Sequence, residues 1–212
     1  MIPYDFPPGI TDSNVIRERI TNAERQLCLP RAQPLESKGQ LATAFHEAGH
    51  ALFNEAFGRS VLRVTCREHQ DSFRDISCLG SCEYNAEVHL SPRLDYISVL
   101  AAAYTEAHAD GSGYKGKIRI DGCGDCADIE KIEAEYAPGG QLHQSLRDAI
   151  GREITRLLNN TVLGHIQAVA IVLFGHETLS GDQLREILTQ RSFHNCSALF
   201  EFAERNKNRG IT

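Results

Sequence analysis

The stretch SKGQLATAFHEAGHALFNEAFG, residues 37–58, predicts the helix around which the rest of the fold is organised. Its apolar residues recur three or four positions apart, which is the spacing of a helix with one buried face. They are Leu41, Phe45, Ala48, Leu52 and Ala56. Ser37 with Gln40 fits a capping box at the start, and Gly58 fits a stop. Gly49, inside the helix, predicts close approach of another backbone, either a strand or a substrate.

Two histidines and a glutamate on this helix indicate a metal site. His46 and His50 are four residues apart, so their imidazoles project from the same side of the helix on adjacent turns. Two imidazoles at that spacing can hold one zinc ion. Zinc lowers the pKa of its bound water to about 7 and polarises a peptide carbonyl, while Glu47, which is not a ligand, can take the proton. The pattern therefore predicts metal-assisted peptide hydrolysis, with Glu47 as the general base.

A catalytic zinc site needs a third protein ligand, which leaves one position for water. Spacing alone leaves several candidates open: His69, His89, Glu106, His108, Asp125, Cys126 and Asp128. The strongest region is residues 121–128, a Gly/Asp/Cys-rich turn that leads into a helix. Such a turn can place a short carboxylate rigidly.

Composition narrows the class of protein. With 212 residues of which 42% are hydrophobic, the chain is long enough for one domain with a real core. A net charge of -6 argues against a nucleic-acid partner, because phosphate backbones require a basic surface. No apolar run reaches the ~18 residues of a membrane span, and the first residues lack the apolar centre of a signal peptide. We therefore expect a cytoplasmic protein with no membrane contact.

The pattern of the remaining chain predicts an α+β fold, mostly α-helical, with a small β-sheet beside the metal helix. The predicted helices are residues 14–28, 37–58, 91–109, 126–136, 141–159, 161–174 and 182–188, and Ser180 with Gln183 is predicted to cap the last of them. The predicted strands are residues 60–66, 76–82 and 87–90, and residues 67–75 are predicted to be a loop. We expect a peptidase domain over 37–190, preceded by an arm (1–36, a helix plus a Pro-rich linker) and followed by a tail (191–212).

The seven cysteines are expected to be free thiols in a reducing compartment. Two close pairs form an alternative: Cys78 with Cys82, and Cys123 with Cys126, whose four thiolates would suit a second, structural zinc ion.

Residues 43–52, TAFHEAGHAL, closely resemble the zinc-binding helix of the FtsH family, the membrane-bound AAA zinc metalloproteases. The similarity extends over about residues 37–190. Leu79 and Gly80 stand where that family has the Leu-Gly of its substrate-side edge strand. Residues 128–130, Asp-Ile-Glu, resemble the family's Asn-Asp-hydrophobic-Glu turn.

The resemblance implies that Asp128 is the third zinc ligand beside His46 and His50. It also implies that Glu106, which matches the first of the family's paired acids, lies behind the ligands, and that Leu79 and Gly80 lie along the substrate. The chain departs from the family at Ala127, where an asparagine is usual. Because residues 123–126 are also richer in Cys and Asp than the family's turn, Asp125 or Cys126 can compete as ligand.

These patterns predict a zinc-dependent endopeptidase that hydrolyses flexible or unfolded polypeptides, which would add as a strand beside residues 76–82. The family joins its peptidase to an ATPase and a transmembrane segment, and we expect neither here. A separate ATPase is then an expected partner, and a homo-oligomeric ring is consistent with the family. The alternatives are a non-catalytic peptidase-like binding or adaptor module, and a regulatory protease dedicated to one target.

Overall fold

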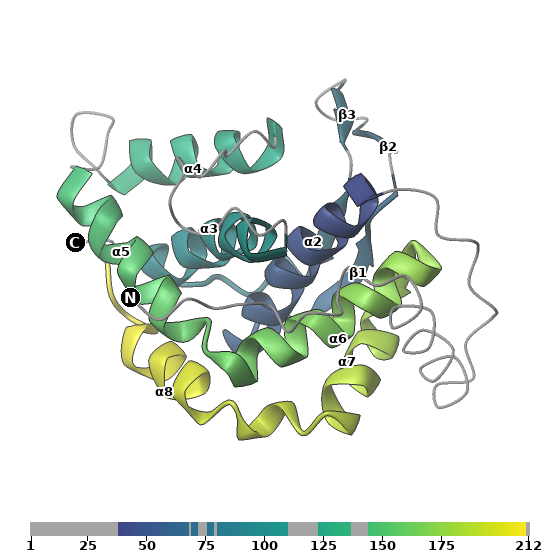
Figure 1. Cartoon of the computed structure of the whole chain (residues 1–212). Coiled ribbons are helices and arrows are strands. Elements are labelled where there is room, and N and C mark those ends of the chain that lie inside the picture. The colour runs from purple at the N-terminus through teal and green to yellow at the C-terminus, as the bar shows by residue number, and fades with distance from the viewer. Residues whose placement is uncertain are drawn as a thin grey trace.

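The computed structural model describes residues 38–67, 69–71, 76–78, 80–109, 123–136 and 144–210. Over these residues the fold is α+β and mostly helical, with a small antiparallel sheet, as predicted. Figure 1 shows the helices stacked in layers, with α4 on one side, α3 and α2 in the middle, and α6, α7 and α8 beyond them. The predicted arm, residues 1–36, lies outside the described residues.

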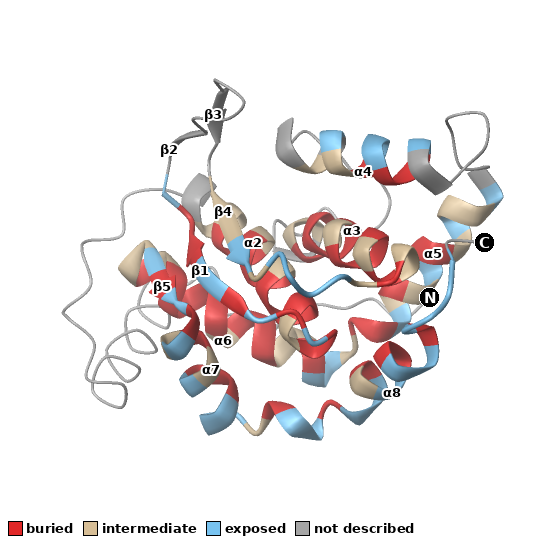
Figure 2. Ribbon diagram, turned by 180° about the vertical axis from the view of Figure 1, so that it is seen from behind, coloured by how far each residue is buried: buried red, intermediate tan, exposed pale blue. Residues whose placement is uncertain are grey.

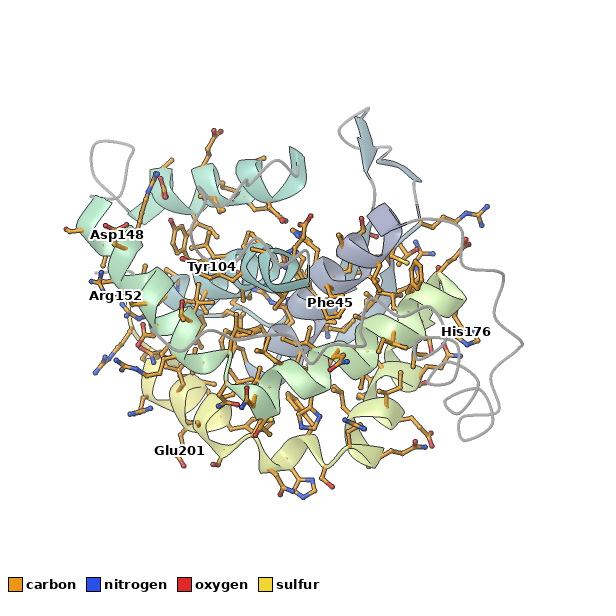
Figure 3. All side chains as sticks on the ribbon, in the orientation of Figure 1. Phe45, Tyr104, Asp148, Arg152, His176 and Glu201 are labelled. Atoms are coloured by element: carbon orange, nitrogen blue, oxygen red, sulfur yellow. The ribbon has the colours of Figure 1, made fainter. Side chains whose placement is uncertain are left out.

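Helix α2 (Lys38–Ala56) is the predicted metal helix, and it runs through the centre of the molecule. It packs against α3 (Pro92–Ala109) and α6 (Asn160–His176). Leu41 near its start is partly buried, and the apolar positions from Phe45 to Ala56 are fully or almost fully buried; the place of Phe45 at the centre is visible in Figure 3. Gly58 follows the helix with a positive φ of 86°, a conformation that suits glycine at a helix end.

Helices α2 and α3 approach each other closely at Gly49. A Cβ atom on Gly49 would lie 2.4 Å from the Thr105 Oγ1 atom and 3.0 Å from the Ala102 Cα atom. The neighbouring backbone is therefore that of α3, and not the strand or substrate that the sequence suggested. The Thr105 hydroxyl donates to the Phe45 carbonyl at 3.0 Å, which fixes the two helices at this contact.

The main sheet has three antiparallel strands in the order β4–β1–β5. Strand β1 (Val61–Thr65) confirms the strand predicted over 60–66. It pairs with β4 (Ser81–Tyr84) on one side and β5 (Thr178–Ser180) on the other. Val64 lies opposite Cys82 and Leu179, and the buried Val64 and Leu179 turn this face toward the helices.

The strand predicted over 76–82 is two strands, β3 (Ile76–Cys78) and β4, with Gly80 between them. Strand β3 pairs with β2 (His69–Asp71), which lies inside the predicted loop. The strand predicted over residues 87–90 is wrong, because this stretch is part of a turn. The Asn85 side chain accepts from the Glu87 amide at 3.0 Å and the Asn85 carbonyl accepts from the Val88 amide, a local arrangement that competes with strand pairing.

The later helices are α4 (Cys123–Tyr136), α5 (Gln144–Leu157), α6, α7 (Gly181–Gln190) and α8 (Ser197–Asn206), with a short 3-10 turn η2 (Phe193–Asn195). Helices α4 to α7 correspond to predicted helices, whereas α8 and the turn η2 lie within residues 191–212, where a tail was predicted. Helix α4 begins three residues earlier than predicted. Ser180 and Gln183 form a capping box at the start of α7, as the sequence indicates.

The C-terminal residues are part of the folded domain. Phe193, Leu199 and Phe202 are buried and belong to the same apolar core as α2 and α6, and Figure 2 shows the buried face of α8 turned toward the other helices. Within the predicted tail over 191–212, the chain packs on the domain as far as the buried Asn206, and the last described residues, 207–210, are exposed.

Within the described ranges, no single helix has the length and apolar character needed to cross a membrane. The pair α5 and α6, bent by 80° at their junction, meets that criterion together by length and composition.

Candidate metal centre

Three side chains from two helices converge at the predicted site. His46 and His50 come from α2, and Asp125 comes from the first turn of α4. One ligand atom from each lies within 4.8 Å of the others, and no other such group of three occurs among the residues that the structure describes. The two Nε2 atoms are 3.2 Å apart, and Asp125 Oδ2 lies 2.7 Å from His46 Nε2 and 3.3 Å from His50 Nε2.

Helix α3 orients both imidazoles from behind. His50 Nδ1 donates to the Ser98 carbonyl oxygen at 3.1 Å, and His46 Nδ1 lies 2.9 Å from Glu106 Oε2. A carbonyl and a carboxylate only accept hydrogen bonds, so each ring carries its proton on Nδ1. Both Nε2 atoms are then left facing the Asp125 carboxylate, where either a proton or a metal cation can lie between nitrogen and oxygen.

The pKa shifts of His46, His50 and Asp125 indicate that positive charge is favoured at the point where these side chains meet. Burial by itself would lower the pKa of His46, but hydrogen bonds to Asp125 and Glu106 outweigh it and raise that pKa to about 10. Burial by itself would also lower the pKa of His50, but the negative charge of Asp125 outweighs burial and raises that pKa. Burial would raise the pKa of Asp125, but the two histidines hold it well below its usual range. A metal cation meets the same electrostatic demand.

The distances fit a tetrahedral ion. Ligands at 2.0–2.1 Å from zinc in a tetrahedron lie about 3.3 Å from one another. The Nε2–Nε2 separation of 3.2 Å and the 3.3 Å from His50 Nε2 to Asp125 Oδ2 match that value. The remaining contact, 2.7 Å from His46 to Asp125, is a direct hydrogen bond that would have to open by about half an ångström. The group His46, His50 and Asp125 can therefore hold a metal ion.

The structure brings Asp125 to the histidines where the family resemblance implied Asp128. Asp128 lies three residues further along α4 and is not among the converging side chains. Because α4 already begins at Cys123, Asp125 falls in its first turn and faces α2. The buried Ile129 and Ile132 set which side of α4 is turned toward α3. The sequence pattern alone had included Asp125 among the candidates for the third ligand.

The predicted general base lies next to the edge strand. Glu47 is 6% exposed, and a Cβ atom on Gly80 would lie 2.6 Å from its Oε1 atom. Gly80 directly precedes β4, which pairs on one side with β1 and within the described sheet has no strand on its other side. The Glu47 carboxylate is therefore held against the start of an open strand edge.

The other candidates fall into two groups. His89 is exposed and does not join the cluster. The side chains of His69, Leu79, His108 and Cys126 lie outside the described residues, as do those of Cys78 and Cys123. Of the cysteines proposed for a second zinc site, Cys82 is described, and it is a free thiol like Cys66 and Cys196. No pattern in the sequence indicated that the backbone carbonyl of Ser98 would accept a hydrogen bond from His50.

Comparison with known proteins adds no relative: no protein-family model matches the chain, and no curated protein matches it.

Proposed function

We propose that this protein is a zinc-dependent endopeptidase of the FtsH-like kind, acting on flexible or unfolded polypeptides. The observation that carries the proposal is the convergence of His46, His50 and Asp125 with Glu47 one residue after the first histidine on the same helix. Zinc suits this donor set, because two imidazoles and one carboxylate with an open fourth position is a pattern of catalytic zinc sites.

Each residue then has a defined task. His46, His50 and Asp125 would hold the ion, and Glu106 and the Ser98 carbonyl keep the imidazoles oriented with Nε2 toward it. A bound zinc ion would supply Lewis acidity, which polarises a peptide carbonyl and makes water acidic near neutral pH. Glu47 accepts the proton from the attacking water and passes it to the leaving amine.

The substrate proposal follows from the strand next to Glu47. Among the described strands, β4 lies at the edge of its sheet, where an extended chain can pair through its main chain with little demand on sequence. Only a flexible or unfolded segment can extend in this way. Folded targets would need a separate ATPase to present them, and both that partner and a ring of copies belong to the proposal. We place the activity in the cytoplasm, where free thiols such as Cys66 and Cys196 persist.

The test compares Glu47→Gln with wild type in zinc content and in cleavage of a labelled, unfolded polypeptide. We expect Glu47→Gln to bind zinc as wild type does and to lose cleavage by a factor of about 100 or more. The matched control, Glu87→Gln, changes an exposed glutamate and should leave both unchanged. Equal and negligible cleavage by wild type and Glu47→Gln, with zinc bound in each, would favour the second candidate, a non-catalytic binding or adaptor module.

A regulatory protease dedicated to one target uses the same site, so the two proteases differ only in substrate range. Cleavage of several unrelated flexible proteins supports the general peptidase, whereas cleavage of a single one supports the dedicated enzyme.

A further inference from the structure

Glutamate 133 is a buried acid that the proposed chemistry does not use. It lies on α4, is 3% exposed, and accepts a hydrogen bond from the Tyr96 hydroxyl at 2.7 Å. Its other carboxylate oxygen accepts from the guanidinium of Arg147. Tyr96 belongs to α3 and Arg147 to α5, so a single carboxylate joins three helices.

This junction matters because of where α4 lies. In Figures 1 and 2, α4 forms a layer of its own on the outer side of α3, away from α6. The described part of α4 has two apolar side chains in the core, Ile129 and Ile132. Apolar contacts allow a helix to slide and roll by small amounts, whereas a buried charge-assisted hydrogen bond has a defined length and direction.

The roll of α4 determines the position of Asp125. Glu133 and Asp125 are eight residues apart on one helix, about 12 Å along its axis at 1.5 Å per residue. A carboxylate about 6 Å from the axis moves by about 2 Å when the helix rolls by 20°. Metal–ligand distances tolerate only about 0.2 Å, so a roll of that size removes Asp125 from the site.

We propose that Glu133, held by Tyr96 and Arg147, is a positioning residue that sets the register of α4 and thereby places Asp125 against His46 and His50. The inference rests on the proposed metal site, and it concerns the affinity for the metal before any reaction. Burial, and then Glu133, raise the pKa of Tyr96, so its hydroxyl remains a donor throughout the physiological range.

The test removes one hydroxyl and measures zinc affinity by competition with a chromophoric chelator, with no substrate present. Tyr96→Phe keeps the ring and its packing. We expect it to weaken zinc binding about tenfold, the size of effect found for groups behind metal ligands. Arg147→Gln, at a partly exposed position, should weaken binding in the same direction and serves as the second variant if Tyr96→Phe folds poorly. Tyr104→Phe is the matched control, because that ring also comes from α3 (Figure 3) and its hydroxyl lies against Gly151 of α5 rather than donating to Glu133.

Coupling to Asp125 separates positioning from a general loss of stability. In the Asp125→Ala background the third ligand is already gone, so adding Tyr96→Phe should change zinc affinity no further. An equal loss in both backgrounds, or an unchanged affinity in Tyr96→Phe, overturns the positioning role and leaves the metal site standing. Failure of wild type to bind zinc, or equal binding by wild type and Asp125→Ala, removes the proposed site and this inference together.

Discussion

Gly80→Ala adds a single methyl group beside the proposed general base, and its effect can be worked out from the contacts. The added Cβ would lie 2.6 Å from Glu47 Oε1, and 2.8 Å from both Glu47 Cγ and Thr43 Cγ2. Ordinary contacts begin at 3.4 Å, so the Glu47 carboxylate must move by about 0.8 Å (3.4 minus 2.6). Gly80 has no positive φ, so the backbone itself can accept alanine.

Displacing a catalytic group by about 1 Å can reduce a rate about 100-fold, which corresponds to about 2.7 kcal/mol of transition-state stabilisation. We expect kcat/KM for an unfolded polypeptide to fall by that factor in Gly80→Ala. Zinc affinity should stay unchanged, because Gly80 touches no ligand. The stability loss should be no more than about 1–2 kcal/mol, because the end of a glutamate side chain can turn away.

Peptide cleavage, zinc affinity and urea unfolding are measured on the same preparations. Gly164→Ala is the control, since a Cβ there meets nothing within 4 Å, and it should cleave at the wild-type rate. Wild-type cleavage by a folded, zinc-loaded Gly80→Ala protein would refute the idea that this close approach sets the position of Glu47.

Three further outcomes can be measured by unfolding. Gly58→Ala should lower the free energy of unfolding by about 1 kcal/mol, because alanine is strained at a φ of 86° even though the space around its Cβ is open. Gly164→Ala should leave the free energy of unfolding unchanged or raise it. Burial, and then Arg191, lower the pKa of His165. The contribution of neutral His165 to the free energy of unfolding is therefore complete above about pH 6.5 and is lost as the pH falls. His165→Leu should flatten this acid-side decline, and His194→Leu, at an exposed position, should not. Zinc at about 100 times its Kd should raise the unfolding free energy by about 2.7 kcal/mol, and chelation should reverse this; an unchanged melting curve would contradict metal binding.

The elements that local pattern determines were predicted well. The helix 37–58 and the capping box at Ser180 depend on spacing and on side chains a few residues away, and both occur in the structure. The short strands were predicted less well, because β2 and β5 are three residues each and exist only through their pairing partners. Such strands carry too little pattern of their own to be read from sequence.

The sequence by itself determined the pair of histidines and the glutamate beside them, because residues one and four apart on a helix have a fixed relation wherever that helix lies. Only the tertiary structure decided that Asp125 and not Asp128 completes the group, and that Glu106 and the Ser98 carbonyl orient it from behind. Those partners come from α3 and α4. Their positions depend on how whole helices pack, which for α4 includes the burial of Ile129 and Ile132.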